Sequence, residues 1–190
     1  MNETLKNLVK AFIGESQARN RYSFYAKIAS KEGFEEIAEL FLITADNERE
    51  HAKKLFELIQ ELKDDLNEVE VQTKAPVKYG TTINNLKAAI EGENYEHSIM
   101  YPSFAKTARE EGLPKIGARL MAISRAEEHH EERYKKLLAQ LEAKTFFKKS
   151  EVKEWVCRKC GYVHKGTEPP MKCPSCDHEK KYFELKCEEY

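Results

Sequence analysis

Two short motifs in this sequence pair a carboxylate with an imidazole: Glu48-x-x-His51 and Glu127-x-x-His130. On a helix, residues three apart are neighbours on one face, so each motif can direct both side chains at a single point. Carboxylate oxygens and imidazole nitrogens are common ligands of divalent metal ions. Each motif therefore supplies half of a candidate metal site.

A lone glutamate precedes each motif, Glu15 before the first and Glu93 before the second. A buried carboxylate costs several kcal/mol unless it is neutralised, so a cluster of them requires compensating cations. A lone glutamate on two helices and a Glu-x-x-His motif on the other two is how ferritin-like bundles hold a di-iron or di-manganese centre. One such motif would arise easily by chance in a glutamate-rich helix. Two motifs in matching phase predict a dinuclear metal site.

Three further residues belong to the candidate site. Glu96 follows Glu93 by three residues, and the first half of the chain has an uncharged residue at the equivalent place. We expect an additional carboxylate for one metal, the alternative being a solvated glutamate. Tyr22 and Tyr101 are expected on the inward helix faces, either as core residues or as hydrogen-bond donors to the site.

Four cysteines form a second candidate site, Cys157-x-x-Cys160 and Cys173-x-x-Cys176. Two such loops can present four thiolates tetrahedrally to zinc or to a single iron. The spacing does not distinguish an iron site from a structural zinc ribbon. The fifth cysteine, Cys187, is expected to be a packed thiol, and the clustering favours a metal site in a reducing compartment over disulfides.

Long helices must position the first site. Apolar residues recur at steps of three and four over residues 4–30, 37–62, from about Thr81 onward, and, after Gly112 and Pro114, from Leu120 to Leu141, which predicts four helices. Residues 64–80 lose this period and read as a long crossover. The fold expected is mainly α: a four-helix ferritin-like bundle with a long crossover, followed by a small four-cysteine metal domain.

The two halves of the bundle repeat one another. Glu15 and Glu93 are 78 residues apart, whereas Tyr22 and Tyr101 are 79 apart, so the second half has one extra residue. A single inserted residue in a helix predicts a π-bulge. His97 and His129 fall outside the inward faces and are expected to be exposed.

Composition bounds the remaining possibilities. The 190 residues are 41% hydrophobic and 34% charged, with a formal net charge of −1, which argues against a nucleic-acid partner. No stretch approaches the roughly 20 apolar residues of a membrane span. We expect a soluble, cytoplasmic protein with a bundle in residues 1–145, a linker in 146–153 and the metal domain in 154–190.

Together these motifs resemble the rubrerythrin family, which joins a ferritin-like di-iron bundle to a rubredoxin-like domain. The resemblance covers essentially the whole chain. It rests on Gly14-Glu15, Glu48-Arg49-Glu50-His51, Gly92 to Glu96, Met100-Tyr101-Pro102, Glu127 to His130, Cys157 to Tyr162 and Cys173-Pro174-Ser175-Cys176.

The resemblance implies roles for the ligands of two irons in the bundle and a third iron, or zinc in recombinant material, in the cysteine site. Glu48 and Glu127 would bridge the two irons. Glu15 would be terminal on one iron, and Glu93 with His130 on the other.

The resemblance also implies that Glu96 and His51 exchange on the first iron, and that Tyr22 and Tyr101 hydrogen-bond the ligand carboxylates. One departure from the family pattern is Asp177, which stands where a glycine would follow the second cysteine loop.

The function implied is reduction of hydrogen peroxide to water, an oxidative stress defence, with electrons entering through the four-cysteine iron. The donor implied is NAD(P)H acting through a separate reductase or a rubredoxin. The alternative is a ferroxidase or iron-handling protein with a structural zinc ribbon, and a third possibility is metal that serves only stability.

A partner subunit is also expected. A mid-bundle site lies roughly 20 Å from the end of a helix of about 28 residues, which is far for fast electron transfer from the attached tail. We expect a homodimer, head-to-tail or domain-swapped through the crossover, in which one subunit's tail approaches the other's bundle.

Overall fold

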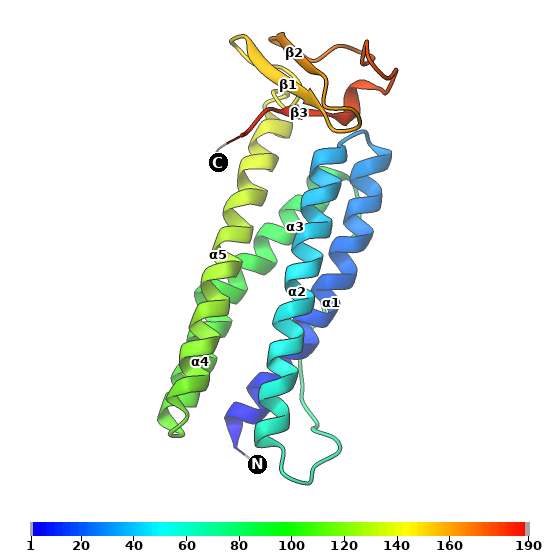
Figure 1. The fold of residues 1–190 in the computed structure, drawn as a ribbon. Coiled ribbons are helices and arrows are strands. Elements are labelled where there is room, and N and C mark those ends of the chain that lie inside the picture. The colour runs from blue at the N-terminus through cyan, green and yellow to red at the C-terminus, as the bar shows by residue number, and fades with distance from the viewer. Residues whose placement is uncertain (1, 189–190) are drawn as a thin grey trace.

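A computed structural model describes residues 2–188 as a bundle of long helices with a small sheet at one end (Figure 1). Helix α1 spans Glu3–Lys31, α2 Glu35–Leu62 and α5 Pro114–Glu142. The remaining stretch consists of α3 (Thr82–Tyr95), the π-helical segment η1 (Glu96–Met100) and α4 (Tyr101–Glu110). No helix in the described range has the length and apolar content needed to cross a bilayer.

Glycines with a positive φ end the first helix of each hairpin. Gly33, with φ of 86°, separates α1 from α2, and Gly112, with φ of 78°, separates α4 from α5. Glycine adopts this left-handed backbone at little cost, so both turns can be tight. The repeated Gly33 and Gly112 therefore build two matching antiparallel hairpins.

The predicted crossover is confirmed between α2 and α3. It runs back along the bundle, so that α3 begins near the α1–α2 turn (Figure 1). The hydroxyl of Tyr25 donates to the carbonyl of Lys78 at 2.7 Å, and the amide of Thr82 donates to a carboxylate oxygen of Glu32 at 2.9 Å. Both hydrogen bonds fasten the end of the crossover to the first hairpin.

The predicted π-bulge is confirmed as η1. The amide of Tyr101 donates to the carbonyl of Glu96, which is the i to i−5 hydrogen bond of a π-helix. Pro102 follows directly and opens α4, where the missing amide hydrogen costs least.

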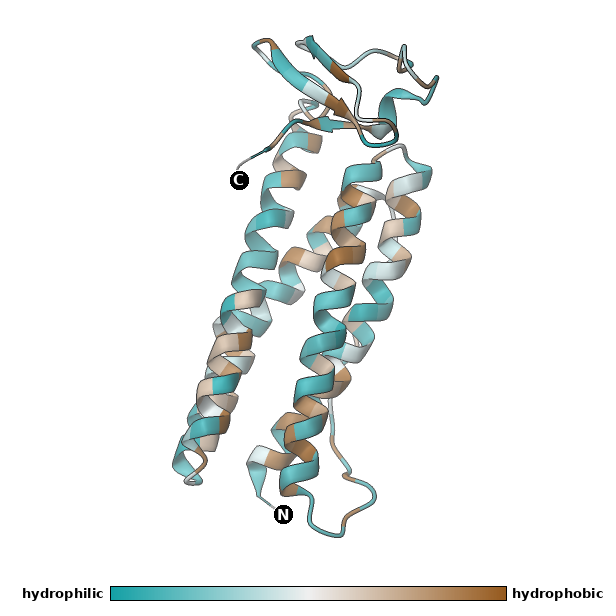
Figure 2. Ribbon diagram, viewed as in Figure 1, coloured by the Kyte–Doolittle hydropathy of each residue, from teal (hydrophilic) through white to brown (hydrophobic). Residues whose placement is uncertain are grey.

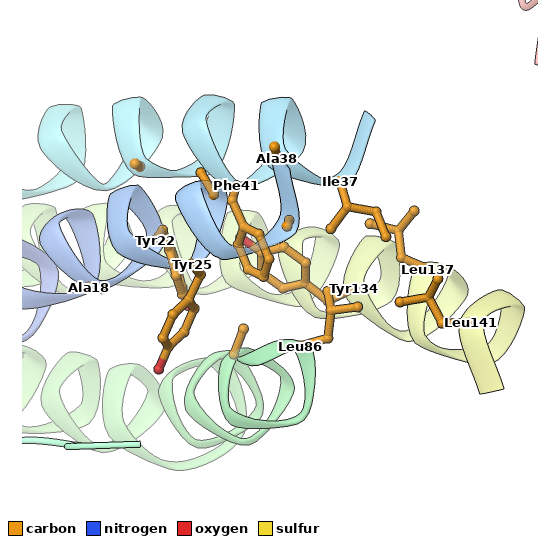
Figure 3. Close-up of a cluster of buried hydrophobic side chains, with 14 of the residues drawn as sticks. Ala18, Tyr22, Tyr25, Ile37, Ala38, Phe41, Leu86, Tyr134, Leu137 and Leu141 are labelled. Atoms are coloured by element: carbon orange, nitrogen blue, oxygen red, sulfur yellow. The ribbon is translucent and has the colours of Figure 1, made fainter. Parts of the chain in front are cut away.

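Two apolar cores lie along the bundle, one on each side of its charged middle. In Figure 2 the middle of α2 is hydrophilic and lies between more hydrophobic stretches. The core nearer the tail contains Tyr22, Tyr25, Phe41 and Tyr134, which pack together in Figure 3. The other core is mostly aliphatic; its fully buried members include Leu8, Leu55 and Leu120. The two cores isolate the charged middle from water above and below.

The tail is a three-stranded antiparallel sheet in the order β2-β1-β3, formed by Lys153–Cys157 (β1), Val163–Gly166 (β2) and Phe183–Leu185 (β3), with a 3₁₀ turn η2 at Lys180–Tyr182. Its core is Trp155, Phe183 and two of the cysteines.

The tail also contacts the bundle. Arg158 forms ion pairs with Glu39 of α2 and with Glu184 of β3, and the ammonium of Lys181 lies 3.5 Å from Glu35. In the predicted linker, Phe146 is buried in the bundle core, and Phe147 packs against both the bundle core and the tail core. These contacts seat the sheet on the α1–α2 end of the bundle.

Candidate metal centres

The structure brings the predicted glutamates and histidines of the bundle into two groups of potential metal ligands. Within each group one ligand atom per residue lies within 4.8 Å of all the others. The first group is Glu15, Glu48, His51 and Glu127, and the second is Glu48, Glu93, Glu127 and His130. The two groups share Glu48 and Glu127.

The shared carboxylates divide their oxygens between the two groups. His51 Nδ1 lies 3.1 Å from Glu48 Oε2 and 2.9 Å from Glu127 Oε1. His130 Nδ1 lies 3.2 Å from Glu48 Oε1 and 2.8 Å from Glu127 Oε2. One oxygen of each carboxylate thus faces each histidine, which is the arrangement of two carboxylates that bridge two cations.

Burial provides a test of whether metal ions fit this cluster. Glu15, Glu48 and Glu127 are fully buried and Glu93 is 1% exposed. Several of their polar atoms have no hydrogen-bond partner in the described chain: Glu15 Oε2, Glu48 Oε1, Glu93 Oε2, both carboxylate oxygens of Glu127, and His130 Nδ1. Orphaned buried oxygens are costly without a cation. The donor set fits two divalent metal ions.

The electrostatics show how the metal-free cluster compensates. Burial, reinforced by the charges of Glu127 and Glu48, raises the pKa of Glu15 well above its usual value. Burial and the Glu48 charge raise the pKa of Glu93 to about 8. Without metal, both carboxyls therefore tend to hold protons.

The histidines compensate in the opposite sense. Burial lowers the pKa of an imidazole, but the adjacent carboxylates of Glu127 and Glu48 outweigh it and raise the pKa of His51 to about 10 and that of His130 to about 12. Burial would raise the pKa of Glu48, yet the two adjacent imidazoles hold it at about 2. Without metal, protonated imidazoles would therefore supply the positive charge that balances the Glu48 carboxylate.

Two buried tyrosines brace the lone glutamates from the opposite hairpin. The Tyr22 hydroxyl of α1 donates to Glu93 Oε1 of α3, and the Tyr101 hydroxyl of α4 donates to Glu15 Oε1 of α1. Burial and the adjacent carboxylates raise the pKa of both phenols, which keeps the protons on these donors. These contacts match the hydrogen-bonding role predicted for both tyrosines.

The π-helical segment η1 begins with Glu96, predicted as an additional metal ligand, and His97, predicted to be exposed. Glu96 is half-buried and belongs to neither ligand group, although burial and the charges of Glu93 and Glu127 raise the pKa of its carboxyl well above the usual value. The exposure predicted for His97 is wrong: its Nε2 lies 3.2 Å from Glu131 of α5. The extra residue of the π-turn rotates His97 toward α5. His129 is exposed, as predicted.

Two residues near this cluster were not singled out in the sequence. Tyr134 is buried against Tyr22, with ring centroids 5.7 Å apart, and its hydroxyl has no partner among the described residues. Arg21 places a buried guanidinium nitrogen close enough for its charge to lower the pKa of Glu96. The three-four spacing places Tyr134 on the inward face of its helix, four residues after His130, but gives it no role at the site, and nothing in the sequence distinguishes Arg21.

The four tail cysteines form a third group of potential ligands. Cys157 and Cys176 have sulfurs 3.7 Å apart, and those of Cys160 and Cys173 are 3.6 Å apart. Four sulfurs this close, with no disulfide, fit a tetrahedral metal ion. Cys160 is exposed, so one edge of the site faces solvent.

The two cysteine loops repeat one geometry. The amide of Gly161 donates to the carbonyl of Cys157 at 2.8 Å, and that of Asp177 to the carbonyl of Cys173 at 2.9 Å. Gly161 has φ of 76° and Asp177 has φ of 58°. Asp177, which stands where the family pattern has glycine, therefore adopts a left-handed backbone conformation. The prediction that Cys187 is a packed thiol is wrong. Cys187 is exposed, because the sheet ends at Leu185.

Comparisons with known proteins agree with both sites. A rubrerythrin family model matches residues 6–138, and a model of the rubredoxin-like domain of rubrerythrins matches residues 155–184. The chain belongs to the rubrerythrin family. The family and the fold class predicted from the sequence are confirmed, and the bundle cluster is the di-iron site of a rubrerythrin beside a rubredoxin-like four-cysteine iron site.

Individual relatives span the full chain. A putative rubrerythrin of Methanocaldococcus jannaschii is 61% identical over 100% of this chain and 96% of its own, and a rubrerythrin of Nitratidesulfovibrio vulgaris is 43% identical over 97% and 94%. The fully reduced nigerythrin structure is 36% identical, with a TM-score of 0.65 over 96% of this chain and 86% of its own. A Desulfovibrio desulfuricans bacterioferritin, 21% identical over 74% of this chain and 81% of its own with a TM-score of 0.67, shares the bundle fold.

The rubrerythrin site is not symmetric in its access to solvent. The side chain of His51 is 17% exposed and that of His130 is 4% exposed. The Glu15 and His51 position is therefore the one that a small molecule from solvent reaches first.

Proposed function

We propose that this rubrerythrin is a peroxidase that reduces hydrogen peroxide to two waters with two electrons and two protons. The observation that carries the proposal is the pair of ligand groups sharing Glu48 and Glu127. Two ferrous ions held side by side would supply one electron each, which matches the demand of O–O bond cleavage. A mononuclear site would supply only one of the two electrons.

The protein's own residues hold and orient this centre. Glu48 and Glu127 fix the spacing of the two metal positions, while Tyr22 and Tyr101 fix the orientation of the lone glutamates. The aromatic core above and the aliphatic core below keep water away. His51, whose side chain is 17% exposed, would be the ligand nearest to a small substrate that approaches from solvent.

Electron entry through the tail forms part of the proposal. The four-cysteine iron would pass electrons from a reductase or rubredoxin, ultimately from NAD(P)H, to the bundle. Cys173 is fully buried in the tail core and far from the bundle ligands in sequence. We expect Cys173→Ser to abolish donor-driven peroxide turnover while the bundle keeps its helix content. Unchanged turnover would refute the electron-entry role.

The rival function is iron handling, in which Fe(II) is oxidised and no electron donor is needed. Single-turnover oxidation of the fully ferrous protein separates the two. A peroxidase is oxidised much faster by peroxide than by dioxygen, whereas a ferroxidase responds to added Fe(II) and dioxygen. A red ferric tetrathiolate in the purified protein favours the peroxidase, and a colourless zinc site favours the rival.

A homodimer would shorten the electron path. In α5, His130 lies twelve residues before Glu142, which is about 18 Å at 1.5 Å per residue, and the sheet begins only at Lys153. A second subunit in a head-to-tail or swapped arrangement would bring its tail to this bundle. Analytical ultracentrifugation with parallel activity measurements tests this, and a fully active monomer would exclude it.

A further inference from the structure

An open groove with a volume of about 740 Å³ lies where the tail meets the α1–α2 end of the bundle. Lys27 and Lys31 of α1 and Leu42 of α2 line its bundle side, and Lys159 and Tyr182 line its tail side. Figure 1 shows the tail seated over this end of the two helices. The groove is separate from the di-iron cluster, which lies deeper along the bundle.

The groove carries uncompensated positive charge. Its two glutamates are already paired, Glu35 with Lys181 and Glu39 with Arg158. Lys27, Lys31 and Lys159 are exposed, and none of them has a carboxylate oxygen within 4.0 Å anywhere in residues 2–188. The whole chain has a net charge of −1, so three free ammonium groups in one groove mark a local surface of opposite sign.

The tail wall of this groove is part of the cysteine site itself. Lys159 stands between Cys157 and Cys160, and the sulfur of Cys160 is the most solvent-accessible route to the tail iron. The ammonium of Lys159 lies 4.7 Å from the ring centroid of Tyr182, whose carbonyl accepts a hydrogen bond from the amide of Arg158 at 2.9 Å. A molecule held in the groove is therefore adjacent to the Cys157–Cys160 loop.

We propose that this groove docks a small acidic electron-carrier protein, whose carboxylates contact Lys27, Lys31 and Lys159 and whose redox centre comes to rest beside the Cys157–Cys160 loop. The proposal rests on the proposed function, because it identifies the surface through which the peroxidase receives electrons. Leu42, 49% exposed, provides an apolar centre within the charged rim, as protein interfaces commonly have. Complementary charge would raise the encounter rate and fix the orientation.

The electron count favours a one-electron carrier over a nucleotide bound directly. At each encounter the reduced carrier loses one electron and the ferric tail iron gains it, and no bond forms or breaks. Two encounters supply the two electrons for one peroxide. A reduced pyridine nucleotide gives up a hydride, which is two electrons and a proton, and a single one-electron iron cannot accept it.

The test compares charge reversal in the groove with charge reversal elsewhere. Lys27→Glu/Lys31→Glu alters the groove without touching the cysteine loop, and Lys106→Glu/Lys115→Glu makes the same change of net charge at the α4–α5 end of the bundle. The measurement is the second-order rate at which a reduced acidic rubredoxin reduces the tail iron of the iron-loaded protein. We expect a fall of about tenfold or more at low salt for the groove variant and less than about twofold for the control.

Salt dependence provides a second measurement. The difference between the groove variant and wild type should disappear at high ionic strength, where the Debye length falls to about 3 Å. Lys159→Glu should slow the reaction further, with an unchanged visible spectrum showing that the iron site is intact. Equal rates for the groove variant and wild type at low salt would overturn the proposal.

Two controls distinguish a failure of the docking proposal from a failure of the proposed peroxidase function. Peroxide consumption with a small uncharged one-electron reductant should be equal in wild type and the Lys27→Glu/Lys31→Glu variant. If no reductant supports peroxide consumption, the proposed function fails, while the reduction rate of the tail iron still reports on docking. If the groove variant changes the sedimentation behaviour and its rate loss follows that change, the groove belongs to a subunit interface and the docking proposal is wrong.

Discussion

Removing the metals should make the stability of the bundle fall steeply as pH rises. In the metal-free fold the pKa of Glu93 is raised to about 8 by burial and by the Glu48 charge, against 4.5 in an unperturbed glutamate. A group with a raised pKa stabilises the fold fully below its unfolded pKa and loses that contribution as pH rises through its folded pKa. The folded protein therefore holds one extra proton on Glu93 between these values.

The size of the effect follows from proton linkage. One extra bound proton changes the free energy of unfolding by about 1.4 kcal/mol per pH unit, so Glu93 alone accounts for about 4 kcal/mol between about pH 5 and pH 8. His51 and His130, with pKa values raised to about 10 and about 12, add in the same direction above about 6.5. Glu48, held at about 2, acts only in acid, where its contribution is lost as pH falls. A domain stable by about 5–15 kcal/mol would show such a loss clearly.

Urea unfolding followed by far-UV circular dichroism at a series of pH values measures the free energy of unfolding of the bundle, because all the long helices lie in the bundle. Metal-loaded protein should show a much flatter pH dependence, since cations replace the protons. Glu93→Gln should flatten the metal-free profile, and Glu50→Gln, at an exposed position, should not. A metal-free stability that is constant or rises between about pH 5 and pH 8 would refute the account of the cluster.

Three further predictions concern the ligand braces, the tail and the helix packing. Tyr22→Phe and Tyr101→Phe each remove a hydrogen bond to a ligand carboxylate, so Fe(II) affinity in competitive titrations should fall by about 10–100-fold, and an unchanged affinity would mean that the bonds do not orient the ligands. Asp177→Gly should stabilise the tail by about 0.5–1 kcal/mol in unfolding followed by Trp155 fluorescence, because φ at this position is 58°, whereas Asp177→Ala should destabilise it. Gly117→Ala should lower the free energy of unfolding by about 1–3 kcal/mol, since the added Cβ would lie 2.8 Å from the Ala105 carbonyl oxygen. Gly14→Ala, whose Cβ would meet nothing within 4 Å, should raise it by about 0.5–1 kcal/mol, and equal effects of the two variants would contradict the packing of α4 on α5.

The fold was largely predictable because its signals are local and repeated. The helical period, the paired glycines and the loss of period after Leu62 each follow from short-range physics. The π-turn was predictable for another reason: the offset between the two halves changes from 78 to 79 residues, and only an inserted residue accounts for this. The seating of the tail was not predictable, because the Arg158 ion pair with Glu39 joins residues far apart in the chain.

The ligand set was predictable because spacing on a helix determines which side chains share a face. The effect of the π-turn on its own side chains was harder to anticipate. An inserted residue rotates all that follows, and the sequence does not say where within Glu93 to Tyr101 the rotation occurs. His97 was therefore placed on the wrong side, toward solvent and away from Glu131. Arg21 was missed because its influence on Glu96 depends on tertiary packing.

The long crossover is the only covalent link between two hairpins, each of which brings half of the ligands. Glu15, Glu48 and His51 come from the first hairpin, and both metal positions need residues from the second. A chain cut within residues 64–80 would consist of two separate pieces, neither able to build a complete metal position alone. Metal ions would then hold the two pieces together, so the fraction of associated fragments would depend on the metal concentration.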